Sequence, residues 1–255
     1  MAEGPPTGPP TGPPRADGIA LIPLDGIGEV EPGTDLARLL VGALAPAAVD
    51  GPELRQGDVV VVTQKIVSKA EGRLVPIDPD DPAAKVALVQ QESVRILRRR
   101  GDLIISETTH GFICANAGID LSNVDRGTAA LLPEDSDRSA RRIRAGLRAL
   151  LAVDVGVIIS DTFGRTWRRG VTDVAIGCAG VAAVIDLRGT PDANGRDLVA
   201  TEVCVADELA SAAELVMGKD RAIPAAIVRG VPREWLRRAS VQAEIVRPPH
   251  EDLFR

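Results

Sequence analysis

The sequence predicts a mixed α/β protein whose strands and helices do not follow a regular β-α-β repeat. Short β-branched runs, such as VVVV at 59–62, indicate strands with both faces covered. Other segments carry apolar residues three or four positions apart, which is the period of an amphipathic helix. Several expected strands follow one another with no helix between them, so neither a simple doubly wound sheet nor a β/α-barrel is expected.

About ten strands are expected, each a short apolar run that ends in polar residues or glycine. They include residues 18–24, 57–63, 101–107, 128–133, 153–160 and 222–230. Residues 173–189 provide one or two more. The strand at 153–160 has particular interest, because Asp161 and Thr162 follow its expected end directly.

About five helices are expected from apolar periodicity and capping residues. They cover residues 34–44, 83–100, 136–151 and 207–217, with a polar turn or short helix at 64–70. Thr34 is placed to cap the first of them. The apolar stripe of the second includes Val86 and Val94, and its arginine-rich end would suit the negative end of the helix dipole.

The expected domain organisation is simple. Residues 18–247 should form one domain between a tail at 1–17 and a polar tail at 248–255. The first tail repeats GPPT and cannot bury surface, so we expect it to be disordered and polyproline-like. It could serve as a ligand for a PxxP-binding domain, although a passive tail is the interpretation that we favour.

Composition restricts the class of partner and the compartment. Aromatic residues make up 2% of the chain and the net charge is −6, so a nucleic-acid-binding protein is not expected. Three widely spaced cysteines and two histidines offer neither a disulfide framework nor a histidine-rich metal site. The cysteines are instead expected to be small buried side chains. Without a signal peptide or a membrane-spanning run, we expect a cytoplasmic protein.

The stretch SDTFGRTWRRGVTD at 160–173 offers the most chemistry. Asp161 and Thr162 could supply a carboxylate and a hydroxyl to a metal ion. Three arginines, at 165, 168 and 169, could hold anionic oxygens with paired hydrogen bonds. The alternative is a surface loop whose arginines pair with Asp173 and its neighbours.

Three further segments place polar residues after apolar runs. The turn LDGIGEVEPG at 24–33 is a weak phosphate signal, and an ordinary turn explains it as well. Lys65 and Lys69 would share one helix face, where a phosphate between them would relieve their repulsion unless both are simply solvated. The polar loop at 106–124 contains Asp120, a hard oxygen ligand for Mg²⁺ or Mn²⁺, and His110, for which we favour a structural role.

Four motifs together resemble the coenzyme F420-0:L-glutamate ligase family. They are VVTQKIVSKAEGR at 61–73, AGIDLSNV at 117–124, SDTFGRTWRRGVTDVAIG at 160–177, and VADELASAAELVMGK followed by AIPAAIVRG at 205–230. The resemblance implies a family-specific fold seen as an intertwined homodimer. It also implies GTP-dependent, γ-linked addition of L-glutamate to the deazaflavin precursor through an acyl phosphate. The implied cations are Mg²⁺ or Mn²⁺, with K⁺ as a further candidate.

The resemblance also suggests roles for individual residues. Asp120 and Asp161 match the metal-bridging aspartates, with Thr162 beside the second metal. Positions that match GTP contacts are Ile27, Gly28, Glu29, Val30, Gln64, Lys69 and Asn123, with Met217, Gly218 and Lys219 as a later nucleotide loop. Some relatives carry serine where this chain has Gln64. Arg165 and Arg168 are the expected clamp for the acceptor phosphate or the glutamate carboxylates.

Other functions fit parts of the same pattern. A paralogue that ligates another amino acid, or a metal-dependent phosphatase, would use the same residue types. A non-catalytic nucleotide-binding or scaffolding protein would explain the proline-rich tail. The two aspartates argue against such a scaffold, because neighbouring carboxylates are costly to keep without a cation.

Overall fold

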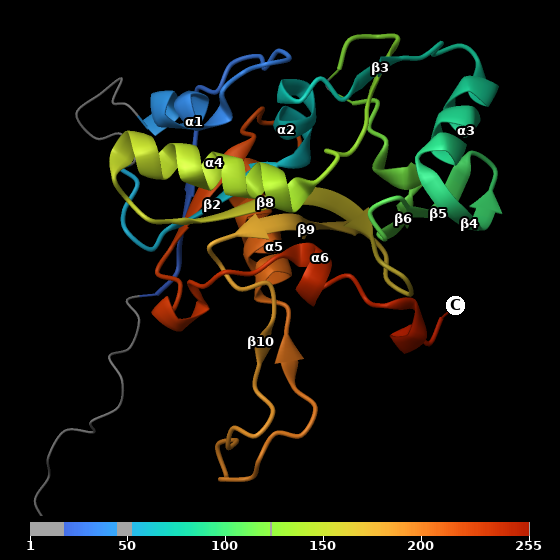
Figure 1. Ribbon diagram of the computed structural model, residues 1–255. Coiled ribbons are helices and arrows are strands. Elements are labelled where there is room, and N and C mark those ends of the chain that lie inside the picture. Colours follow the sequence, from blue (N-terminus) through green and yellow to red (C-terminus); the bar gives the residue numbers. More distant parts are fainter. Residues whose placement is uncertain (1–17, 45–52, 123, 255) are drawn as a thin grey trace, which may run out of the picture.

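The computed structural model describes residues 18–44, 53–122 and 124–254, and it is built around one five-stranded β-sheet (Figure 1). Its mixed α/β architecture, with twelve strands and six α-helices in the described residues, confirms the predicted fold class. The predicted tail at 1–17, Asn123 and Arg255 lie outside the described residues. Within them, no helix combines the length and the apolar character that crossing a membrane requires.

The central sheet has the strand order β1-β12-β2-β8-β9. These strands are β1 (Ala20–Pro23), β12 (Ala225–Arg229), β2 (Val59–Thr63), β8 (Gly156–Gly164) and β9 (Val171–Ala179). The pair β2 and β8 is parallel, whereas all other neighbours are antiparallel. The carboxyl end of β2, at Thr63, therefore lies beside Ser160 of β8, and β8 continues beyond it to Gly164.

Helices cover both faces of this sheet, as Figure 1 shows for α4 and α5. On one face, α1 (Leu36–Leu44) and α4 (Ser136–Leu151) share an apolar core with Val60, Val62 and Ile159. On the other, α5 (Val205–Met217) and α6 (Val241–Glu244) pack against the alternate strand residues. Burial of each such side chain stabilises the fold by about 1.5–3 kcal/mol, which explains why the VVVV run is apolar throughout.

Two glycines permit the close approach of α4 to its neighbours. A Cβ atom on Gly177 of β9 would lie 2.3 Å from the carbonyl carbon of Ser136, at the start of α4. A Cβ atom on Gly146 would lie 2.4 Å from the Cβ of Ala37 in α1. Any larger residue at either position would have to push the helix away from its core contacts.

A smaller lobe lies beside the central sheet (Figure 1). It contains a helix and a three-stranded sheet, namely α3 (Pro82–Gln91), β4 (Ser93–Arg100), β5 (Leu103–Thr108) and β6 (Ile113–Ala115). A two-stranded ribbon of β3 (Leu74–Pro76) and β7 (Thr128–Ala130) belongs to the same half of the chain. The strands β10 (Ile185–Asp186) and β11 (Glu202–Val203) begin an arm that projects from the body (Figure 1).

The single helix predicted for residues 83–100 is wrong. The helix α3 ends at Gln91, and Ser93–Arg100 form strand β4 in a hairpin with β5. Val94 is therefore 68% exposed on a strand and does not continue a helical stripe. Likewise, the arginines expected at a helix end lie on an exposed strand. The β-branched residues Val94 and Ile96 favour a strand over a helix. Hydrogen bonding of this segment to β5 therefore stabilised the strand more than its apolar spacing stabilised a helix.

Three local predictions need correction. Thr34 does not cap α1, because its hydroxyl donates to the carbonyl of Glu31, and Asp35 accepts hydrogen bonds from the first helical N–H groups instead. The strand predicted for 153–160 continues to Gly164, so Asp161 and Thr162 lie within β8. The helix α5 begins at Val205, two residues earlier than expected. The short helix considered for 64–70 is present as α2 (Gln64–Ala70).

Candidate functional site

A cleft of about 1210 Å³ opens at the carboxyl ends of β2 and β8. The parallel register pairs Thr63 with Ser160, after which β2 turns into α2 and β8 runs on with β9. Polar residues that follow either strand therefore face the same space. The turn at 27–32, the loop at 115–125 and the residues after α5 complete the lining of the cleft.

The side chains of β8 divide between the two faces of the sheet. Successive residues of a strand point to opposite faces, so Asp161 points away from Ser160 and Thr162. An irregularity in the pairing with β9 follows Ile159, where Ile176 is the extra residue on β9. Such a bulge redirects the side chains beyond it. The cleft consequently contains two polar groups, one around Asp161 and the other around Thr162.

The first group joins Asp120 to Asp161. Asp120 is positioned by two backbone hydrogen bonds with Ala130, one in each direction, which form an isolated antiparallel β-bridge. Its carboxylate accepts the N–H of Ser122 at 2.7 Å and lies 2.9 Å from the ammonium nitrogen of Lys65. Lys65 thus stands with Asp120 and does not form a cation pair with Lys69.

The two aspartates differ in proton affinity. Burial raises the pKa of Asp161 to about 7, and repulsion from Asp120 and Asp173 acts in the same direction. Burial also acts on Asp120, but hydrogen bonds from Lys65 and Ser122 outweigh it, so the pKa of Asp120 is lowered. Asp161 is therefore a carboxylate short of positive partners, and a cation would stabilise its charged form.

The second group joins β8, β9 and the end of α5. Asp173 is 2% exposed, and its carboxylate accepts hydrogen bonds from Ser160 at 3.0 Å and Thr162 at 2.7 Å. Lys219 contacts the same carboxylate at 2.7 Å and Glu214 at 3.0 Å. Although burial opposes the charged amine, these acidic partners raise the pKa of Lys219. Lys219 therefore carries its positive charge at the rim of the cleft, between two carboxylates.

Most of the predicted nucleotide contacts lie along the same cleft, among them Ile27, Gly28, Glu29, Val30, Gln64, Lys69, Gly218 and Lys219. Lys69 is 8% exposed and pairs with the carboxylate of Glu29, which links α2 to the turn at 27–32. Gln64 is 2% exposed, and its amide donates to Ser68 and to the carbonyl of Leu131. These two hydrogen bonds occupy the amide donors of Gln64, and they hold the start of α2 against the segment that follows β7.

Three predicted site residues lie elsewhere. Met217 is fully buried in the core beneath α5. Arg165 and Arg168 lie on the exposed hairpin loop between β8 and β9 and do not line the cleft. The interpretation that these arginines pair with Asp173 is wrong, because Arg165 donates to the carbonyl of Arg169 and Asp173 is held by Lys219 and two hydroxyls.

Sequence reasoning missed Asp173 as a member of the site. A recognisable signal was present, because the polar stretch GRTWRRG carries glycine at both ends and separates two apolar runs. Such a pattern predicts a hairpin, and pairing outward from Gly164 and Val171 would have placed Thr162 opposite Asp173. Because Asp173 would then lie within a strand and opposite the hydroxyl of Thr162, a buried hydrogen bond between the two would have been expected.

The cysteines and His110 take no part in the cleft lining. Cys114 and Cys178 are buried as expected, while Cys204 is half-buried. Burial raises the pKa of each thiol to about 12, so none is a ready nucleophile. His110 stacks on Phe112 with ring centres 6.1 Å apart, and burial lowers its pKa.

The oxygen donors of the cleft fit a hard divalent cation better than a soft one. Two carboxylates, Asp120 and Asp161, repel each other, and ammonium groups already contact Asp120 and the Thr162–Asp173 pair. In the described residues, no three His, Cys, Asp or Glu side chains form a complete metal-binding cluster. An ion such as Mg²⁺, which retains water and binds substrate phosphates, needs only one or two carboxylates from the protein.

Comparison with known proteins places the chain in a family. Residues 26–230 match the family described as F420-0:Gamma-glutamyl ligase. The "Coenzyme F420:L-glutamate ligase" of Methanothermobacter thermautotrophicus is 43% identical over 93% of this chain and 99% of its own length. The protein of that name from Methanopyrus kandleri is 44% identical over 89% and 94%. That from Methanocaldococcus jannaschii is 38% identical over 79% and 86%. The chain therefore belongs to the F420-0:gamma-glutamyl ligase family and is an enzyme of the ligase class.

Proposed function

We propose that this chain adds L-glutamate, through a γ-linkage, to coenzyme F420-0 with GTP as the co-substrate. One observation carries the proposal: two repelling aspartates and three lysines line a single cleft within the residues that match the ligase family. The curated relatives named above carry the corresponding activity in their names. Paired acidic and basic groups of this kind suit a triphosphate that is bound together with cations.

The lysines are the proposed triphosphate contacts. Lys69 is held by Glu29 at the base of α2, and Lys219 is held by Asp173 after α5. Both side chains are oriented before a ligand binds, which reduces the cost of ordering them. We assign the turn at Ile27–Val30 and the Gly218 turn to the nucleotide as well, since residues of both turns line the cleft. Asn123, the remaining expected contact, lies outside the described residues.

The aspartates are the proposed metal ligands. Asp120 and Asp161 would hold one Mg²⁺ or Mn²⁺, and Thr162 with Asp173 would face a second. When bound, these ions neutralise phosphate charge and polarise the transferred phosphoryl group. Lys65 and Lys219 already contact oxygens of both groups, which supports the assignment of these oxygens as cation ligands.

The proposed reaction has two steps. A carboxylate oxygen of the acceptor attacks the γ-phosphorus of GTP, the bond to the bridging oxygen breaks, and GDP leaves with that electron pair. The resulting acyl phosphate is then attacked at its carbonyl carbon by the amino group of glutamate. Phosphate leaves, and the nitrogen loses a proton as the amide forms. The residues of the cleft contribute mainly by positioning the reactants and stabilising negative charge.

Arg165 and Arg168 remain the proposed clamp for acidic groups of the acceptor or of glutamate. The loop that carries them joins Thr162 to Asp173 through the hairpin, so an anion bound there would lie beside the second polar group. Their exposure supports a role in capturing substrate and not in the phosphoryl transfer itself.

We also propose that the chain acts as a homodimer. The arm that begins at β10 and β11 projects from the body, and Val199 within the arm is 86% exposed. An extended arm of this kind gains stability when it packs on a second copy of the chain. Light scattering at micromolar concentration tests this, since the arm deleted between Ile185 and Val203 should yield monomers.

The function is tested by incubating the full chain with GTP, Mg²⁺ or Mn²⁺, L-glutamate and coenzyme F420-0. Mass spectrometry should detect products that are heavier by successive glutamyl units, together with GDP. Asp120→Asn and Asp161→Asn should abolish these products. GDP without a glutamylated product would favour a phosphatase or a ligase for another amino acid. Full activity in both variants, or nucleotide binding without any turnover, would reject the proposed site.

A further inference from the structure

We propose that the chain has a second ligand site, an arginine-lined cleft for an elongated anion that carries carboxylate or phosphate groups at both ends. This cleft has a volume of about 1140 Å³ and lies at the amino ends of β2 and β8, beside Gly57, Asp58 and Val155. The ligase cleft lies at the carboxyl ends of the same two strands. The two sites are thus separated by the length of a strand, about 15–20 Å.

The charge of the second cleft is opposite to that of the whole chain. Seven arginines and three acidic residues line it, which leaves an excess of four positive charges, although the chain as a whole carries −6. Like charges gathered in one concave surface repel one another and attract counter-ions. The lining contains no lysine, and the planar guanidinium group is suited to binding a carboxylate or a phosphate through two parallel hydrogen bonds.

Three of the arginines form a rigid frame because their partners are fixed. Arg229 contacts Asp58, which is 2% exposed, through two hydrogen bonds of 2.8 and 3.0 Å. Arg237 contacts both oxygens of Glu244 at 2.7 and 2.9 Å. Arg144 is held by Asp154 and by the carbonyl of Val155. These pairs consume all three acidic residues of the cleft.

The other four arginines keep most of their hydrogen-bonding capacity. Among the described residues, the guanidinium groups of Arg233 and Arg238 have neither an ion pair nor a hydrogen bond. The guanidinium groups of Arg55 and Arg141 each have one ion-pair partner outside the cleft, Glu53 and Asp135, at 3.6 Å. Free donors on a fixed frame are what an anionic ligand requires, since binding then costs little side-chain ordering.

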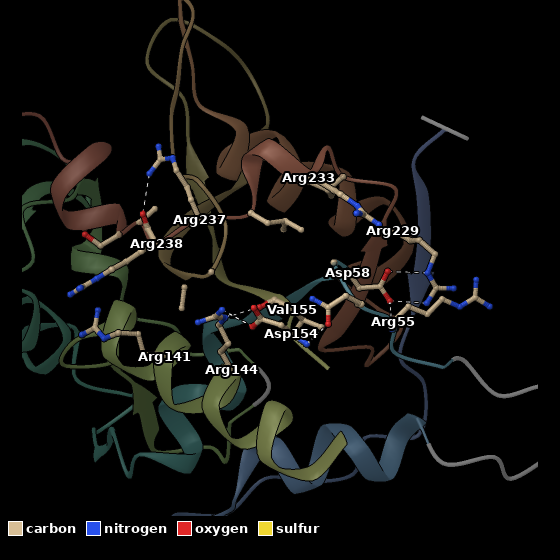
Figure 2. Close-up of a pocket in the computed structure, with 18 of the residues that line it drawn as sticks. Arg55, Asp58, Arg141, Arg144, Asp154, Val155, Arg229, Arg233, Arg237 and Arg238 are labelled. Atoms are coloured by element: carbon tan, nitrogen blue, oxygen red, sulfur yellow. Dashed lines mark hydrogen bonds and ion pairs between the residues drawn. The ribbon is translucent and has the colours of Figure 1, made fainter. Parts of the chain in front are cut away.

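The placement of these groups indicates an elongated ligand. Figure 2 shows Arg141 and Arg238 at one end of the cleft, Arg55 and Arg229 at the other, and Arg144 between them. A single small anion would reach one end only. A flexible chain with several carboxylates or phosphates would reach both and satisfy the free donors. Two sources of this chemistry are an oligo-γ-glutamyl chain and a linear polyphosphate.

Isothermal titration calorimetry of the full chain tests the proposal, with tetra-γ-glutamate and inorganic tripolyphosphate as separate probes. The first variants are Arg233→Glu and Arg238→Glu, which reverse the two free charges. The matched controls are Arg98→Glu and Arg99→Glu, since these arginines are exposed on β4 and do not line the cleft. At least one probe should bind, and its identity distinguishes a carboxylate ligand from a phosphate ligand.

The Kd of the bound probe should rise at least tenfold in each cleft variant and less than twofold in each control. Binding should also weaken as salt increases, because partly exposed charges are screened. The proposal is overturned if neither probe binds, or if both sets of variants weaken binding equally. It is also overturned if the cleft variants bind like the unmodified chain, or if they change only its oligomeric mass. The last result would identify the cleft as a contact with another chain.

Discussion

Thr162 and Asp173 face each other across β8 and β9, and the hydroxyl of Thr162 donates a 2.7 Å hydrogen bond to the carboxylate of Asp173. Lys219 contacts both side chains from the end of α5. The β8–β9 hairpin is therefore fixed to the segment after α5 at the rim of the ligase cleft. Because Asp173 is buried and Thr162 is half-buried, loss of either side chain should be detected in both stability and activity.

Asp173→Asn should reduce the kcat of glutamylation more than tenfold. Asparagine preserves the size of the side chain but removes one of the two carboxylates that hold Lys219, so the lysine is oriented less firmly. Stability should fall by about 1–3 kcal/mol because a charged partner of buried hydroxyls is lost. Steady-state kinetics and urea unfolding measure the two effects. Asp80→Asn, which removes an aspartate from an exposed ion pair, is the control. Unchanged kinetics in Asp173→Asn would exclude this carboxylate from the working site.

Asp161→Asn should abolish ligase activity and yet stabilise the metal-free protein at high pH. The folded pKa of Asp161 is raised to about 7, chiefly by burial, above the value of about 3.9 in an unfolded chain. The folded state therefore binds the proton more tightly, and the unmodified chain loses stability relative to the variant as pH rises between these two values. The difference should be near zero at about pH 4 and about 2 kcal/mol at about pH 8, given partial solvent screening.

Urea unfolding with a chelator at several pH values measures this difference. Addition of Mg²⁺ should stabilise the unmodified chain and leave Asp161→Asn nearly unaffected, because a ligand that binds only the folded state adds to its stability. A difference that does not vary with pH would show that Asp161 is charged without penalty.

Lys69→Met should raise the KM for GTP at least tenfold while lowering kcat less. The ammonium group of Lys69 lies in the cleft, but its stem is buried in α2, and methionine retains most of that packing. Lys85→Met on α3 removes a lysine outside the cleft and should leave both constants unchanged. If the KM for GTP stays constant and that for glutamate rises, Lys69 contacts the amino acid and the nucleotide assignment is wrong.

Arg168→Ala should raise the KM for coenzyme F420-0 or for glutamate several-fold and leave the KM for GTP unchanged. The side chain is exposed on the β8–β9 loop, so its removal should not affect folding. Full kinetic constants for all three substrates separate these effects, with Arg98→Ala as a surface control. If every constant stays at the value of the unmodified chain, the proposed anion clamp has no role.

Local pattern predicted much of the fold and part of the site. The runs at 59–62 and 157–159 are buried strands, and α4 has the predicted bounds, because such periodic burial can be read from neighbouring residues alone. The segment at 83–100 failed for the opposite reason. Its second half carries both a helical stripe and β-branched residues, and pairing with β5, a long-range contact, decided between them.

By itself, the sequence determined which segments are buried and which residue types follow them, and its four motifs identified the family. Only the tertiary structure decided how these residues are grouped. On one face of β8, Asp161 lies with Asp120, which Lys65 contacts after β2. On the other face, the β8–β9 hairpin places Asp173 with Thr162 and Lys219. The second, arginine-lined cleft arises in the same way. Side chains contributed from β12, α4 and the segment at 233–244 meet through long-range packing, which no local pattern contains.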